Sequence, residues 1–72
     1  MYRAAVLTIS DKCSQGKRED KSGEAIREII KQLPAEVVKY EIIPDDPDMI
    51  KKRLLAYSDE LKVDLVLTTG GT

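Results

Sequence analysis

Polar residues that could do chemistry follow three apolar runs of the sequence: Ser10-Asp11, Pro44-Asp45, and the stretch from Thr68 to Thr72, which contains two glycines. The two aspartates could together hold a hard cation such as Mg²⁺, which takes oxygen ligands and usually one or two protein carboxylates plus substrate phosphates. The glycines let the backbone approach an anion closely, and free N–H groups beside threonine hydroxyls could cradle phosphate oxygens. These residue types indicate a site for an anionic, phosphorylated ligand.

Each of these stretches also has a purely structural interpretation. An aspartate in a Pro-flanked turn is often a helix cap, so we assign Asp46 to capping and its neighbour Asp45 to the site. Asp11 could simply turn the chain after its strand, and Ser10 could satisfy backbone groups in the same turn. Most Gly-Gly pairs are turns, so the glycine stretch is significant only if the other two strand ends lie beside it.

The composition narrows the chemistry further. The sequence has no histidine, which excludes imidazole general bases and His-containing metal sites for this segment. The single Cys13 excludes an intramolecular disulfide, and we expect it to be passive, with no helix N-terminus beside it. Basic side chains between residues 11 and 21 could reach phosphate oxygens, but acidic side chains alternate with them, which favours a solvated loop.

Charge and hydropathy bound the class of protein. With 12 basic and 13 acidic side chains the net charge is −1, which argues against non-specific nucleic-acid binding. No apolar run approaches the length of a membrane span or a signal-peptide core. An apolar content of 42% over 72 residues indicates at most one globular domain. We therefore expect a cytoplasmic protein with small-molecule ligands and neither a nucleic-acid nor a membrane partner.

The apolar patterns predict the elements that must position these residues. The almost continuous run from Arg3 to Ser10 suits a strand buried on both faces, and residues 11–20 read as a long solvated loop. A helix capped by Asp20 or Ser22 is expected to run to Leu33, before Pro34. Its apolar stripe recurs at helical spacing: Ile26, Ile29, Ile30 and Leu33.

A second strand and a second helix follow. The segment from Ala35 to Ile43 alternates as a half-exposed strand would, with Val38, Tyr40 and Ile42 on one face. Asp46 and Pro47 then give an N-cap and a first helical residue. The expected stripe of this second helix is Ile50, Leu54, Tyr57 and Leu61. A third buried strand leads into the Thr68 to Thr72 stretch.

This order of strand, helix, strand, helix, strand predicts an open, mainly parallel α/β sheet with helices on both faces. Crossovers are right-handed, and short α/β openings commonly place the first strand in the middle, so the expected strand order is 2-1-3. A ligand crevice is then expected beyond the carboxyl ends of the first and third strands. The three polar stretches should meet there.

Four short motifs, taken in order, resemble a known family: Leu7 to Asp11, Asp20 to Gly23, Ile43 to Asp45, and Leu65 to Thr72. They are similar to the opening half of the molybdenum-cofactor biosynthesis domain, that is, of the Mog-type molybdopterin adenylyltransferases and their MoaB-like relatives. The resemblance covers essentially the whole chain.

What this resemblance implies is a three-layer α/β domain that binds molybdopterin and forms a homotrimer or hexamer in its full-length form. With Mg²⁺ and ATP, the adenylyltransferase members adenylylate molybdopterin. Matched to the family motifs, Asp45 is the catalytic and metal-binding aspartate. The matched substrate-binding residues are Ser10, Asp11, Thr69, Gly70, Gly71 and Thr72.

The family domain is roughly twice as long as this chain. We therefore expect residues 1–72 to be the N-terminal half of a single molybdopterin-binding domain, truncated to β-α-β-α-β and inactive by itself. The alternative is a non-catalytic, MoaB-like module that holds a pterin or a partner without turnover. A receiver-like signalling domain is disfavoured, because its acceptor aspartate is missing from the end of the third strand.

Overall fold

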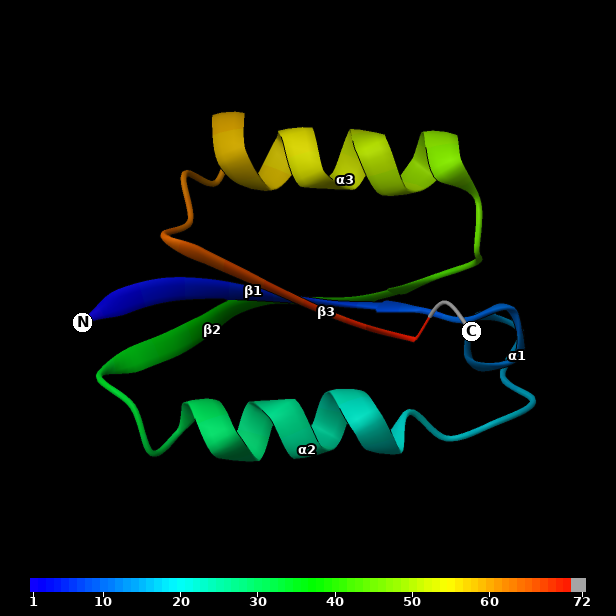
Figure 1. The fold of residues 1–72 in the computed structure, drawn as a ribbon, viewed down its shortest axis with the longest axis horizontal. Helices are drawn as coiled ribbons and strands as arrows, with labels where there is room; N and C mark the ends of the chain where they lie inside the picture. Colours follow the sequence, from blue (N-terminus) through cyan, green and yellow to red (C-terminus); the bar gives the residue numbers. More distant parts are fainter. Residues whose placement is uncertain (71–72) are drawn as a thin grey trace.

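A parallel sheet lies between two helices in the computed structural model, which describes residues 1–70 (Figure 1). The elements in chain order are β1 (Tyr2–Ile9), α1 (Asp11–Ser14), α2 (Lys21–Ile30), β2 (Ala35–Ile43), α3 (Pro47–Asp59) and β3 (Leu65–Gly70). The strand order is β2-β1-β3, and β1 pairs in parallel with both neighbours. Helices α2 and α3 cover opposite faces (Figure 1). The expected three-layer α/β architecture and its strand order are confirmed.

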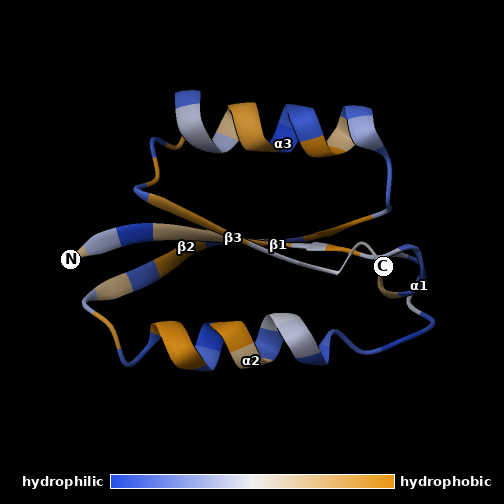
Figure 2. Cartoon of the chain, viewed as in Figure 1, coloured by the Kyte–Doolittle hydropathy of each residue, from blue (hydrophilic) through white to orange (hydrophobic). Residues whose placement is uncertain are grey.

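Strand β1 is the centre of the molecule. Its residues from Ala4 to Thr8 are buried, because β2 and β3 pair with its two edges and a helix covers each face. The small side chains of Ala4 and Ala35 let α2 approach the sheet closely. The core therefore consists of two thin clusters, one between the sheet and α2 and one between the sheet and α3. Figure 2 shows mainly apolar strands between the helices and a hydrophilic connection around α1.

Helix α2 is shorter than the sequence pattern predicted. Asp20 is its N-cap, as expected, but the helix ends at Ile30 and not at Leu33. Gln32 and Leu33 donate backbone hydrogen bonds three residues back, which tightens the chain into turns before Pro34. Leu33, beyond the helix, is 49% exposed, and Ile29, within it, is 59% exposed, so only part of the predicted stripe faces the sheet.

Strand β2 contains an irregularity that overturns its predicted alternation. Val37 and Lys39 pair with the consecutive residues Ala4 and Ala5, so Val38 is an extra residue in the ladder. Val37 and Tyr40 consequently both pack toward α2, although strict alternation had placed them on opposite faces. The bulge aims the Tyr40 hydroxyl at the start of α2.

Helix α3 begins as predicted. Pro47 is its first residue, and Oδ1 of the N-cap Asp46 accepts hydrogen bonds from the backbone N–H groups of Asp48 and Met49. Tyr57 is buried against the sheet, whereas Leu54, predicted to share its stripe, is 38% exposed. In the described part of the chain, no helix combines the length and apolarity that a membrane crossing requires.

Candidate functional site

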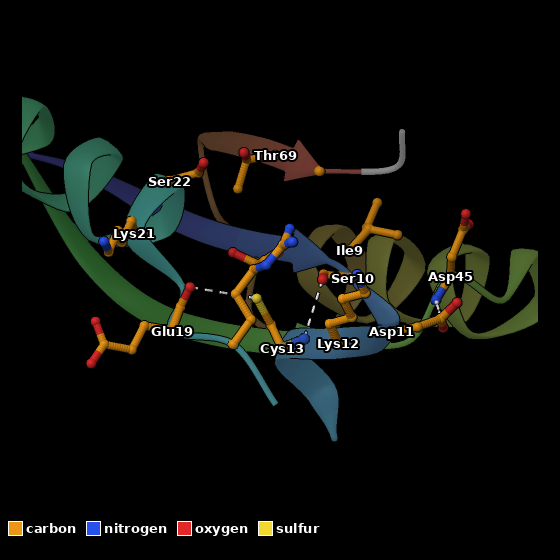
Figure 3. A pocket seen from close by; sticks show the side chains of 13 residues that line it. Ile9, Ser10, Asp11, Lys12, Cys13, Glu19, Lys21, Ser22, Asp45 and Thr69 are labelled. Atoms are coloured by element: carbon orange, nitrogen blue, oxygen red, sulfur yellow. Dashed lines mark hydrogen bonds between the residues drawn. The ribbon is translucent and has the colours of Figure 1, made fainter. Parts of the chain in front are cut away.

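The three polar stretches meet at the carboxyl edge of the sheet, around a cavity of about 730 Å³ (Figure 3). Five of the residues predicted to bind ligand line it: Ser10, Asp11, Asp45, Thr69 and Gly70. The parallel strands bring them together because β1, β2 and β3 all end at this edge. Gly71 and Thr72 lie outside the described residues.

Asp11 and Asp45 are linked directly. The backbone N–H of Asp45 donates a 2.9 Å hydrogen bond to Oδ1 of Asp11, which joins the ends of β1 and β2. The Asp11 side chain thus has a structural role, but it connects the ends of two strands and does not stabilise its own turn. Both residues are exposed at the cavity, so their remaining carboxylate oxygens face solvent.

The expected loop after β1 starts with a helical turn, α1, which sequence reasoning missed. Ser10 is its N-cap, and the Ser10 Oγ accepts a 3.2 Å hydrogen bond from the backbone N–H of Cys13. The expectation that no helix N-terminus lies beside Cys13 was therefore wrong. The polar residues after Ser10 have no apolar periodicity, so the sequence gave no sign of this four-residue helix. The hydrogen bond to the Ser10 cap stabilises it.

Gly70 satisfies a strict backbone requirement. Its φ of +93° lies in the left-handed region, and a Cβ there would collide with the carbonyl oxygen of Ile9 on the neighbouring strand. Thr69, which lines the cavity, pairs with Thr8 across the ladder. The third strand end is therefore held against β1 through backbone contact that only glycine permits.

Charged side chains of both signs surround the cavity. Asp11 and Asp45 lie at one end, whereas Lys21 and Ser22, from the first turn of α2, lie at the other (Figure 3). Lys12 and Arg18 also line the cavity, as does the acidic Glu19, which lies on the side of Lys21 (Figure 3). The arrangement suits an elongated ligand that carries anionic groups and pairs with a cation.

Mg²⁺ chemistry fits the donor set at the aspartate end. Asp11 and Asp45 offer carboxylate oxygens, the ligands that Mg²⁺ prefers, and two protein carboxylates suffice when substrate phosphates and waters complete the shell. Among residues 1–70 no group of three His, Cys, Asp or Glu side chains could hold a metal ion on its own. A cation at this edge would therefore depend on ligand oxygens.

A buried hydrogen-bond network behind the cavity was also missed. Asp20, predicted only as a cap, is 8% exposed and accepts hydrogen bonds from the Thr8 hydroxyl (2.6 Å), the Gly23 N–H (3.0 Å) and the Tyr40 hydroxyl. Burial opposes ionisation, but these three hydrogen bonds together hold the pKa of Asp20 below its ordinary value. Burial and the neighbouring Asp20 carboxylate raise the pKa of Tyr40 to about 12. The network therefore consists of a carboxylate and a neutral phenol at neutral pH.

Comparison with known proteins agrees with this architecture. Residues 5–72 match the family model described as a probable molybdopterin binding domain. A molybdopterin adenylyltransferase of Helicobacter pylori is 45% identical over 69 residues, which cover 93% of this chain and 39% of that protein.

Two solved structures share the fold. The crystal structure of the molybdopterin biosynthesis enzyme MoaB from Thermus thermophilus superposes with a TM-score of 0.94 at 49% identity, and covers 100% of this chain. The tungsten cofactor synthesizing protein MoaB from Pyrococcus furiosus gives 0.82 at 43% identity, again over 100% of this chain. The chain spans 45% and 44% of these two relatives. From the family match over residues 5–72, we conclude that the chain belongs to the family of probable molybdopterin binding domains.

Proposed function

We propose that this protein takes part in molybdenum cofactor biosynthesis as a molybdopterin adenylyltransferase. The observation that carries the proposal is the meeting of Asp11, Asp45 and the Thr69-Gly70 backbone around one cavity, in a chain that matches a molybdopterin-binding family. In the reaction, the terminal phosphate oxygen of molybdopterin attacks the α-phosphorus of ATP. The bond between the α-phosphorus and its bridging oxygen breaks, and pyrophosphate leaves.

The side chains around the cavity act by positioning and charge neutralisation, which is what phosphoryl and nucleotidyl transfer mainly require. Asp45 would hold Mg²⁺, with Asp11 beside it fixing the backbone from which Asp45 projects. Bound there, Mg²⁺ would neutralise charge on the phosphates. Ser10, Thr69 and Gly70, with Gly71 and Thr72 beyond them in the sequence, would bind substrate oxygens.

Asp45 provides the test. The protein expressed from its complete reading frame is mixed with molybdopterin, ATP and Mg²⁺, and pyrophosphate release is measured. Asp45→Asn, which keeps the size of the side chain, should lower kcat by about 100-fold or more, the scale of losing a transition-state charge interaction. Asp59→Asn is the control, because Asp59 is exposed at the end of α3 and does not line the cavity. Equal rates for both variants would overturn the catalytic role of Asp45.

A second candidate is a non-catalytic module that binds molybdopterin or assembles with a partner. The family model favours it, since its description names molybdopterin binding and no reaction. Saturable molybdopterin binding without ATP consumption would support this candidate and exclude the transferase.

We also propose the wider setting that the family resemblance implies. Residues 1–72 would be the N-terminal half of a single molybdopterin-binding domain, in a cytoplasmic protein that assembles as a homotrimer or hexamer. Light scattering of the full-length protein tests the assembly, since a monomeric mass would exclude it.

A further inference from the structure

The buried carboxylate of Asp20 does more than helix capping requires. Asp46 caps α3 with its side chain exposed, and its Oδ1 reaches two backbone N–H groups there. Asp20 is 8% exposed, and of its three partners only Gly23 belongs to the helix it caps. Burying a carboxylate is costly unless it is hydrogen-bonded, so a cap alone does not account for this placement.

The other two partners tie together the elements that form the cavity. Thr8 comes from β1 and itself lines the cavity, while Tyr40 comes from β2. Asp20 does not line the cavity, but Lys21 and Ser22, which follow it directly, do. The carboxylate therefore joins the end of the central strand to the wall formed by the first turn of α2.

The packing around this junction leaves little freedom. A Cβ at Gly23 would overlap the Asp20 carboxylate and the Tyr40 hydroxyl, so α2 can approach the network only with glycine here. On its outer side the Tyr40 ring carries the Arg27 guanidinium, 4.9 Å from its centroid. A larger group added to the network would therefore push the start of α2 away from the sheet.

We propose that Asp20 is a positioning residue for the ligand cavity: it fixes Lys21 and Ser22 at the distance from Thr8 at which they contact the anionic part of the substrate. The inference deepens the proposed function and rests on it for the nature of the ligand. Asp20 itself touches no substrate.

The molecule contains a matched control on its other face. The Tyr57 hydroxyl donates a 2.8 Å hydrogen bond to Oε1 of Glu41, and neither residue lines the cavity. Tyr57→Phe and Tyr40→Phe thus each remove one phenol hydroxyl that donates to a carboxylate. Both changes should lower the free energy of unfolding by a similar amount, because each removes one hydrogen bond to a charged group.

The experiment compares these two variants in the protein expressed from its complete reading frame. Hydrogen–deuterium exchange reports on the peptide that spans residues 19–26, without any ligand. Steady-state kinetics with molybdopterin and Mg-ATP gives KM and kcat separately. For Tyr40→Phe we expect faster exchange in that peptide and a KM for ATP about 5–10-fold higher, with kcat within about 2-fold, because uniform binding is lost. Tyr57→Phe should leave the peptide and KM unchanged.

Two further results decide the inference. Equal exchange in the 19–26 peptide for both tyrosine variants would reduce Asp20 to a general stabilising residue and overturn the proposal. If the wild-type protein releases no pyrophosphate, the proposed function fails while the exchange data still decide the positioning role. Asp20→Asn is the second variant, because it keeps the side-chain shape should Tyr40→Phe fold poorly, and it should accelerate exchange in the same peptide.

Discussion

At the scale of single residues, Gly23 shows how closely α2 packs on the sheet. Ordinarily a helical glycine replaced by alanine gains stability, because alanine has the higher helix propensity. Here a Cβ would overlap the Asp20 carboxylate and the Tyr40 hydroxyl. We expect Gly23→Ala to lower the free energy of unfolding, measured by urea denaturation, by about 2 kcal/mol or more, as overpacking and a broken hydrogen bond combine.

Gly16 is the comparison for this change. Its φ is +75° and nothing lies within 4 Å of an added Cβ, so Gly16→Ala meets backbone strain but no collision. The expected loss is about 1–2 kcal/mol, the cost of a left-handed conformation for an L-residue. A Gly23→Ala protein more stable than the wild type would show that α2 can move away from the sheet freely.

Asp20 also gives the protein a predictable pH dependence. Its pKa in the folded protein lies below the ordinary value of 3.8, so around pH 4 the unfolded chain binds more protons than the folded one. The stabilisation that ionised Asp20 contributes is therefore fully present above its ordinary pKa of 3.8. It is lost as the pH falls through the lower pKa that Asp20 has in the folded protein. In urea denaturation between pH 6 and pH 2, Asp20→Asn should be less stable than the wild type at pH 6, with a shallower decline on acidification.

A variant that keeps every carboxylate is the control for the pH series. Ile26→Val trims a partly buried side chain in the cluster under α2 and should reproduce the wild-type slope at lower stability. Parallel curves for wild type and Asp20→Asn would contradict the role of Asp20 as a buried, stabilising carboxylate.

Sequence reasoning found the residues at the strand ends but not the network behind them. Ser10, Asp11, Asp45, Thr69 and Gly70 were predictable because strand ends in a parallel sheet share one edge. Asp20 looks like an ordinary cap in the sequence, and its partners Thr8 and Tyr40 lie 12 and 20 positions away. Their meeting depends on the bulge at Val38, which no local pattern indicates.

At the scale of elements, the rotation of α2 about its axis can be tested with two adjacent isoleucines. Ile30 is 1% exposed and packs under the helix, whereas Ile29 is 59% exposed. We expect Ile30→Val to lower the free energy of unfolding by about 0.5–1.5 kcal/mol, and Ile29→Val to change it by less than about 0.5 kcal/mol. Equal effects, measured by urea denaturation, would mean that the helix presents a different face to the sheet.

Element types and order were predictable, while their ends were not. Continuous apolar runs and helical stripes predicted the three strands and the two long helices, and the usual topology of α/β openings predicted the strand order. The expectation that the third strand is buried was wrong, because β3 pairs only with β1 within residues 1–70 and none of its residues is buried. The end of α2 was predicted at Leu33, since an apolar residue at helical spacing looks like part of a stripe whether or not the helix continues. The helix ends earlier because the chain forms turns before Pro34, and these turns depend on how the chain enters β2.

At the scale of the whole molecule, the sheet is covered but not closed. With the order β2-β1-β3, only the central strand pairs along both edges within residues 1–70. Several large apolar side chains remain exposed on the helices, on the turn after α2 and on β3: Ile29, Leu33, Leu54, Leu55 and Leu65. The relatives named above are more than twice as long as the matched segment, and open edges of this kind invite association with further chain.

Residues 1–72 produced by themselves should therefore be marginally stable. The two core clusters contain few large buried side chains, and cores of chains this short rarely supply more than about 3–5 kcal/mol. We expect a free energy of unfolding below about 5 kcal/mol in urea denaturation, concentration-dependent association through the free edges, and no pyrophosphate release with molybdopterin and Mg-ATP. A monomer that unfolds cooperatively at high urea would show that one helix on each face of the sheet is enough to stabilise residues 1–72. Pyrophosphate release by this segment would show that it contains all the residues that catalysis requires.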